Sequence, residues 1–199
     1  LVLHAWGSVV GFDFARRYPD RVASLVFYEA HLRPVVDWSM LSLPVKHFIT
    51  DIVDDPKKKV IDAHYLIEQY LSSGMINSPS EMVLGVYRAP FLKPDHRQPL
   101  LQYVHDLPIG MSADDSVVQL IEKYSQFLQS SPIPKCFLYA VPGFIMTMDT
   151  IAWASNRMPN LRLMQLGNAL HYAQETMPEY FSSCLMDWFE NHRVSVCIE

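Results

Sequence analysis

The first 28 residues follow the pattern strand, sharp turn, helix, strand, and this pattern constrains the fold more than any other feature. Residues 1–3 are apolar, residues 1–4 are typical of a short buried strand, and Trp6-Gly7-Ser8 indicates a turn. A helix then runs to Arg16-Arg17, where two basic side chains suit the negative end of the helix dipole. Residues 22–28 form the second apolar strand. Such a βαβ unit predicts a parallel sheet with a right-handed crossover.

Residues 32 to about 132 show a different pattern. Amphipathic helical stretches, separated by breaks that contain proline or glycine, are predicted at residues 60–71, 80–91 and 115–129. No strand of comparable quality occurs between them. Helices inserted between two strands of a sheet are typical of a cap over the carboxyl edge of that sheet.

The sheet pattern then resumes. Residues 135–140 predict a strand, residues 147–157 a helix and residues 161–166 the last strand. Residues 176–192 predict a closing amphipathic helix whose apolar stripe we interpret as core packing: Met177, Phe181, Leu185, Trp188 and Phe189. The expected fold class is therefore α/β, with a mostly parallel sheet, flanking helices and a helical cap. Three segments follow: core at 1–31, cap insertion and return at 32–130, and core at 131–199.

Composition excludes several classes of protein. The formal net charge is −5, with 16 basic and 21 acidic residues, which argues against a nucleic-acid partner. Half of the residues are hydrophobic, which excludes disorder. The longest apolar runs, such as residues 136–148, are too short and too interrupted by proline to cross a bilayer, so no membrane association is expected.

The three cysteines, Cys136, Cys184 and Cys197, lack metal-ligand spacing and indicate reduced thiols, so a cytoplasmic location is expected. The alternative is that they are simply small buried hydrophobic residues. The chain opens at Leu1 directly in a strand pattern, without an initiator Met, and we therefore expect an N-terminal portion to be missing.

Ligands of open α/β sheets bind beyond the carboxyl ends of the strands, so the residues that follow each strand are the candidates for a site. The turn His4-Ala5-Trp6-Gly7 follows the first strand, Glu29 the second and His171 the last. A strand-to-helix turn with glycine two residues after its tip has the shape of a nucleophile elbow. The tip residue here is Ala5, whose methyl group can attack nothing.

An acid after the next strand can orient a histidine, and a histidine after the last strand can act as a general base. The chain order tip, acid, base is the order of α/β-hydrolases. Taken singly, Glu29 could be a solvated charge or a helix cap, Trp6 a core residue, and His171 a structural histidine. Together, around a cap insertion, they predict an α/β-hydrolase site.

The sequence also resembles the haloalkane dehalogenases, whose elbow reads His-Asp-Trp-Gly. The resemblance covers essentially the whole chain. It rests on residues 1–8, 11–17 and 19–22, on Glu29-Ala30 with Arg33-Pro34, and on residues 87–91, 131–135, 142–143 and 170–175. Renilla-type coelenterazine luciferases share the scaffold and similar motifs.

The resemblance implies a reaction in two steps. An elbow aspartate displaces halide to give an alkyl ester, and a histidine oriented by an acid then activates the water that hydrolyses it. In this sequence the base would be His171, the acid Glu29, and the halide donor the indole N–H of Trp6. Val141 is apolar where another subgroup places its acid, which favours Glu29. The resemblance further implies a small apolar halogenated substrate, a halide ion, no cofactor and no metal, with a pocket lined by Phe91, Ile145 and Leu170.

Two departures bear on activity. Ala5 replaces the nucleophile, and Asp13 on the following helix is expected to face elsewhere. In the family that the sequence resembles, the N-terminal portion that we expect to be missing supplies the first strands, the other halide ligand and the oxyanion-hole backbone. The sequence therefore predicts a haloalkane dehalogenase-like hydrolase that is inactive or impaired. The alternatives are a non-catalytic protein that binds a small hydrophobic ligand, and a coelenterazine luciferase-like monooxygenase.

Overall fold

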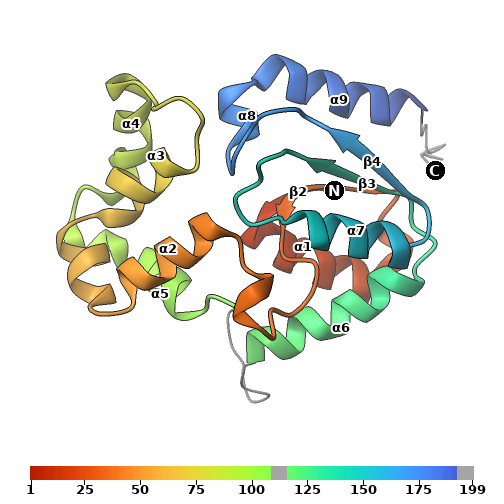
Figure 1. The fold of residues 1–199 in the computed structure, drawn as a ribbon, viewed down its shortest axis with the longest axis horizontal. Coiled ribbons are helices and arrows are strands. Elements are labelled where there is room, and N and C mark those ends of the chain that lie inside the picture. Colours follow the sequence, from red (N-terminus) through yellow and green to blue (C-terminus); the bar gives the residue numbers. More distant parts are fainter. Residues whose placement is uncertain (109–115, 192–199) are drawn as a thin grey trace.

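Four parallel strands lie side by side in the order β1-β2-β3-β4 and form the sheet of the described residues. The strands are β1 (Val2–Ala5), β2 (Leu25–Ala30), β3 (Lys135–Tyr139) and β4 (Leu161–Gln165). This arrangement is taken from a computed structural model, which describes residues 1–108 and 116–191. Helices cover both faces of the sheet, and a further group of helices lies beyond the carboxyl ends of the strands (Figure 1).

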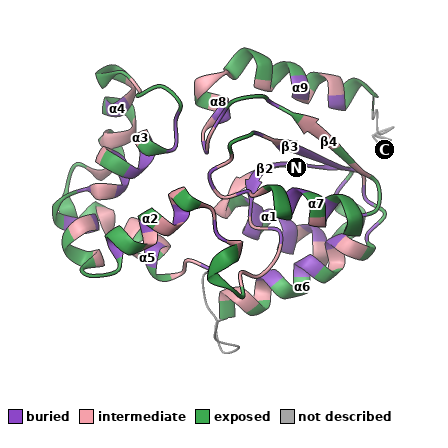
Figure 2. Cartoon of the chain, viewed as in Figure 1, coloured by how far each residue is buried: buried purple, intermediate pink, exposed green. Residues whose placement is uncertain are grey.

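The two faces of the sheet carry separate apolar clusters, because successive side chains of a strand point to opposite sides. Leu25 and Phe27 of β2 pack on the face covered by three helices: α1 (Trp6–Arg17), α6 (Ser116–Ser130) and α7 (Met148–Arg157). Val26 and Tyr28 face the other side, under α9 (Pro178–Asn191) and the short α8 (Ala173–Thr176). In Figure 2 the buried residues accordingly follow the strands and the inner sides of α1 and α6. The sequence prediction of a parallel α/β sheet with flanking helices is confirmed.

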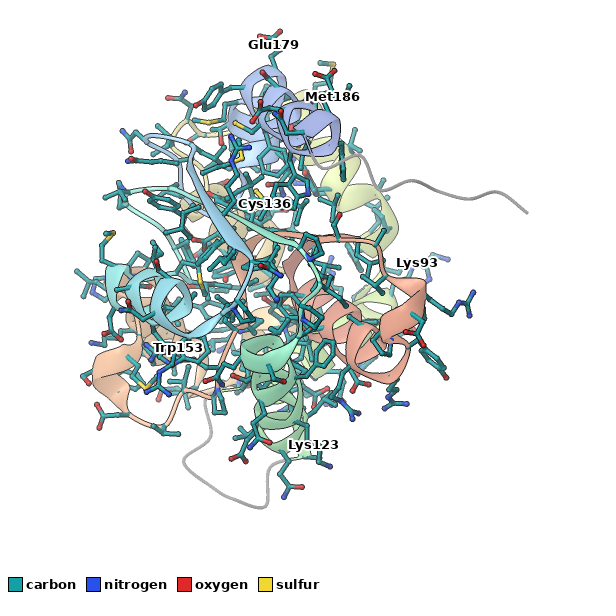
Figure 3. The ribbon with its side chains drawn as sticks, turned by 90° about the vertical axis from the view of Figure 1, so that its right-hand side faces the viewer. Lys93, Lys123, Cys136, Trp153, Glu179 and Met186 are labelled. Carbon is teal, nitrogen blue, oxygen red and sulfur yellow. The ribbon has the colours of Figure 1, made fainter. Side chains whose placement is uncertain are left out.

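The side view shows the same layering. Cys136 of β3 lies in the interior, whereas Lys123 of α6 and Glu179 of α9 project from opposite sides of the molecule (Figure 3). Cys136 and Cys184 are both buried free thiols, and Cys197 lies outside the described residues.

Residues 43–105 form a group of helices that we call the helical lobe. Its α-helices are α2 (Leu43–Ile52), α3 (Leu71–Ser73), α4 (Glu81–Arg88) and α5 (Gln98–His105). Two π-helical segments, Lys58–Asp62 and Leu66–Tyr70, precede α3. The lobe has apolar clusters of its own, one around Phe48 and Tyr70 and one around Leu71 and Leu84.

Several predicted element bounds are wrong for local reasons. The single helix predicted at residues 60–71 is interrupted at His64, whose φ of 55° lies in the left-handed region. The helix predicted at residues 80–91 ends at Arg88 and continues as a 3-10 turn, Ala89–Phe91. The second strand begins at Leu25 and extends to Ala30, so Glu29 belongs to it.

The last part of the segment 32–130 returns to the sheet. Helix α6 packs beside α1, with Tyr124 and Leu128 in the sheet cluster. Two predicted helix ends, Asp115 and His192, lie outside the described residues. Across residues 1–108 and 116–191, no helix has the length and apolar character that a bilayer crossing requires.

Strand β1 has one free edge in the described sheet, and its first residues are open to solvent. Leu1 is 45% and Val2 51% exposed. A free apolar edge is a template for pairing with another chain, so we expect these 199 residues alone to self-associate. Val2→Lys should reduce association measured by sedimentation velocity, since an edge lysine blocks strand pairing.

Val53→Lys is the matched control, because Val53 is 62% exposed but follows a helix. Its association should equal that of the unaltered chain. A monomeric chain with a sharp two-state unfolding transition contradicts this prediction.

Candidate active site

Ala5 occupies a strained turn between β1 and α1. Its φ is 44° and its ψ is −126°, a backbone conformation that costs a residue with a side chain about 1–3 kcal/mol. Hydrogen bonds at the start of α1 hold this turn. The Ser8 hydroxyl donates to the Ala5 carbonyl at 2.6 Å and accepts the His31 N–H at 2.9 Å. The turn is therefore tied to the chain just after β2.

Gly11, rather than Gly7, is the glycine that lets α1 approach the sheet. A Cβ built at Gly11 would lie 2.2 Å from a methyl carbon of Leu3 on β1. A Cβ built at Gly7 meets no atom of the described residues within 4 Å. The close approach of α1 to β1 therefore depends on Gly11 and not on the glycine of the elbow.

Glu29 is placed by a β-bulge. In the pairing of β1 with β2, His4 lies opposite Tyr28 and Ala5 lies opposite Ala30, so Glu29 is skipped. Its φ is 47°, in the left-handed region. A bulge turns one side chain out of the alternation of its strand. Here it directs an acid toward the loop that follows β4.

The carboxylate of Glu29 is almost fully enclosed, with 1% of the residue exposed. It accepts the N–H groups of Phe144 and Met146 at 3.1 and 3.3 Å, and that of Ile145 as well. Its Oε2 also lies 3.2 Å from Nδ1 of His171, which is 2% exposed. The structure thus brings the predicted acid and base into direct contact, with Nδ1 engaged and the other ring nitrogen free to handle a proton.

Two further side chains fix the loop that carries His171. The Nε2 atom of His4 lies 2.8 Å from the His171 carbonyl oxygen, and the Tyr28 hydroxyl donates to the Leu170 carbonyl. Burial lowers the pKa of His4 to about 3, so its ring is neutral and donates an N–H to that carbonyl. Burial also raises the pKa of Tyr28, which keeps its hydroxyl protonated.

Ala5, Trp6 and His171 share a cavity of about 320 Å³ between the sheet and the helical lobe. The lobe contributes apolar and tyrosine side chains to its wall: Leu66, Ile67, Tyr70, Leu71, Tyr87, Leu100 and Tyr103. Trp6 lies edge-on to Tyr103, with ring centroids 5.5 Å apart. The indole Nε1 is buried, and no acceptor among the described residues meets hydrogen-bond geometry with it. The N–H nevertheless lies close enough to the Tyr103 hydroxyl to lower the pKa of that group against the rise that burial causes. A ligand that accepts a hydrogen bond from this indole would therefore share it with Tyr103.

A second, narrower cavity of about 50 Å³ lies on the far side of Tyr70 and Tyr103, which border both spaces. Of the three residues expected to line the pocket, Ile145 borders this second cavity. Phe91 and Leu170 border neither one. Phe91 lies near His64 in the lobe, and Leu170 packs in the cluster around Phe48.

The remaining candidate acids do not reach Ala5. Asp13 forms ion pairs with Arg16 at 2.8 Å and Arg17 at 2.6 Å on α1. The other position considered for an acid, just after β3, holds the uncharged Val141. Within the described ranges, no group of three or more His, Cys, Asp or Glu residues could hold a metal ion.

Some residues of the site carry no signal that single-sequence reasoning could use. Tyr70 and Tyr103 reach the cavity from two separate helical segments, and only the folding of the lobe brings them to Trp6. In the sequence, Tyr28 is not distinguishable from the other apolar and aromatic residues of its strand. His4 stands next to the elbow tip, and that position is the signal that could have marked it.

A parallel sheet with helices on both faces, an elbow at the end of β1, an acid near the end of β2 and a histidine after β4 define an α/β-hydrolase. No protein-family model matches the chain. It is 31% identical over 187 residues to a haloalkane dehalogenase from Sphingobium indicum, covering 93% of this chain and 62% of that protein. It is 30% identical over 195 residues to one from Mycolicibacterium smegmatis, covering 97% and 62%. The chain thus spans about 62% of the length of these relatives.

Solved structures agree with this relationship. The haloalkane dehalogenase DbeA from a Bradyrhizobium species superposes with a TM-score of 0.89 at 27% identity, covering 97% of this chain and 67% of that one. DatA from Agrobacterium tumefaciens C58 superposes with a TM-score of 0.87, also at 27% identity, covering 96% and 66%. The chain is a homologue of the haloalkane dehalogenases over most of its length.

Removing the Glu29 side chain should destabilise the fold strongly. Glu29→Ala leaves three backbone N–H groups and His171 without their acceptor, and breaking a buried pair costs about 3–5 kcal/mol. The free energy of unfolding in urea measures this loss. Asp187→Ala is the control, because its carboxylate is exposed and makes an ion pair with Arg162, worth under about 1 kcal/mol, and one exposed hydrogen bond from Asn191. Equal losses in the two variants contradict the prediction.

Proposed function

We propose that this chain carries a haloalkane dehalogenase-like site from which the alkylation step has been lost. The observation that carries the proposal is Ala5 at the tip of an elbow that is otherwise fully formed. The base and an indole N–H border the same cavity as Ala5, and the acid contacts the base behind it. Such a site binds a halide ion or a small halogenated alkane and forms no ester with it.

The chemistry of the complete reaction explains what is missing. A carboxylate at position 5 would attack the carbon, and the carbon–halogen bond would break as the halide leaves with its electron pair. His171 would then take a proton from water, and the resulting hydroxide would attack the ester carbonyl to release the alcohol. With a methyl group at position 5, the first bond cannot form. The helical lobe acts here as a cap that closes the cavity over these groups.

Trp6→Phe tests halide binding. The substitution keeps an aromatic ring and removes the N–H donor, so bromide should bind more weakly by about 1.5–3 kcal/mol, or roughly 10- to 150-fold. Isothermal titration calorimetry measures this without depending on indole fluorescence. Trp153→Phe is the control, because its ring lies against Arg33, 5.1 Å from the guanidinium carbon, away from the cavity. Equal bromide affinity in all three proteins would show that Trp6 does not hold the halide.

Ala5→Asp tests the lost step. The substitution restores an attacking carboxylate, while His171 and Glu29 remain to hydrolyse the ester. Halide release from a short bromoalkane should rise far above that of the unaltered protein, because removing a nucleophile from a comparable triad costs on the order of 10⁶ in rate. Ala5→Asn, which has similar size but no nucleophilic carboxylate, should stay at background.

The double variant Ala5→Asp/His171→Phe separates the two halves of the reaction. Attack should proceed without hydrolysis, so mass spectrometry should find an alkyl adduct on residue 5. If Ala5→Asp folds and binds bromide, yet neither releases halide nor forms an adduct, the site serves binding alone and the dehalogenase assignment fails.

A further inference from the structure

One carbonyl of the helical lobe holds the loop that carries His171. The Gly74 oxygen accepts two hydrogen bonds, from the His171 N–H at 2.8 Å and from the Tyr172 N–H at 3.1 Å. Gly74 is buried and directly follows α3, and its own N–H is bonded back into that helical turn. The backbone on both sides of the base is therefore anchored to the lobe.

The contact is so close that only glycine fits. A Cβ built at Gly74 would lie 2.8 Å from the Tyr172 ring and 3.1 Å from Cβ of His171. The φ of Gly74 is −84° and its ψ is 3°, which any residue can adopt. The need for glycine at this position therefore comes from the space beside His171 and not from the backbone conformation.

Other contacts join the same loop to the lobe. The Tyr172 ring packs against the apolar cluster of Ile67, Leu71, Met75 and Leu84. The Tyr87 hydroxyl of α4 donates to the Glu175 carboxylate at 2.9 Å. On its sheet side, the loop is held by His4 and Tyr28. The loop thus lies between two bodies, and Gly74 is the point where the lobe bonds to the residue that carries the base.

We propose that Gly74 is a positioning residue, through which the helical lobe sets the distance between the His171 ring and Glu29. A displacement of the lobe then moves the base through these two backbone hydrogen bonds, even though the acid stays fixed in its bulge. The effect on ester hydrolysis rests on the proposed function. The effect on the His171 ring does not.

The first experiment compares Gly74→Ala with Gly85→Ala. Gly85 lies in α4 of the same lobe, and a Cβ built there meets nothing within 4 Å. Proton NMR of the protein with ¹⁵N-labelled histidine reports the Nδ1–H signal of His171, assigned by its loss in His171→Phe. Gly74→Ala should shift or broaden this signal, whereas Gly85→Ala should leave it unchanged. The same signal in both variants and in the unaltered protein overturns the proposal.

The second experiment uses the Ala5→Asp background and separates the two chemical steps. Rapid mixing with a bromoalkane gives a burst of halide for alkylation and a steady rate for hydrolysis. Adding Gly74→Ala should slow hydrolysis about tenfold or more, because misplacing a catalytic group by as much as 1 Å can cost about 100-fold, and should leave the burst rate unchanged. Equal loss in both steps overturns the positioning role. If Ala5→Asp alone shows no burst, the proposed function fails and the NMR comparison still decides the role of Gly74.

A third measurement needs no substitution and decides the matter if Gly74→Ala does not fold. In native-state hydrogen exchange at low urea, the amides of His171 and Tyr172 should open together with lobe amides such as Gly74. The Leu166 amide, bonded to the Tyr139 carbonyl in the sheet, should open at higher free energy. If His171 and Tyr172 open with Leu166 instead, the sheet alone holds the base and the proposal is wrong.

Discussion

The buried carboxylate of Glu29 is the interaction on which the site depends. A carboxylate that is buried away from water is stable only if its oxygens accept hydrogen bonds from the protein. Three successive backbone N–H groups at residues 144–146 and the His171 ring supply these bonds. These partners come from the loop after β3 and the loop after β4. One side chain therefore joins the ends of three strands. The left-handed φ at Glu29 is the local cost of aiming it there, and the hydrogen bonds offset that cost.

Buried hydrogen bonds also hold the residues around His171. His4 and Tyr28 are adjacent in register on β1 and β2, and both donate to backbone carbonyls of the His171 loop. Burial keeps both groups neutral, so neither adds a charge beside the imidazole. From the opposite side the helical lobe contributes Gly74. The position of His171 therefore depends on both the sheet and the helical lobe, and no single element determines it.

The sequence predicts the parallel sheet and places Ala5, Glu29 and His171 at its carboxyl edge, because these signals are local. Ala5 and Glu29 stand at the ends of apolar strands, and His171 lies in the loop after the last one. It does not predict the bulge at Glu29, since a one-residue slip in strand pairing leaves no mark on a run that is buried on both faces. The break at His64 is missed because an unusual φ at a residue other than glycine depends on tertiary packing. Tyr70, Tyr103 and Gly74 belong to the site only through long-range contacts. The periodicity of apolar residues along the sequence carries no information about such contacts.

The backbone turn at Ala5 is held by contacts that do not involve the Ala5 side chain. Ala5 keeps a left-handed backbone although its methyl group gains nothing from it. The conformation is imposed by neighbours: the Ser8 hydroxyl holds the Ala5 carbonyl, the His31 N–H holds Ser8, and Gly11 lets α1 close on Leu3. None of these contacts involves the side chain at position 5. The turn is therefore held independently of the side chain at position 5, and its strain remains at the place where the proposed reaction would need an attacking group.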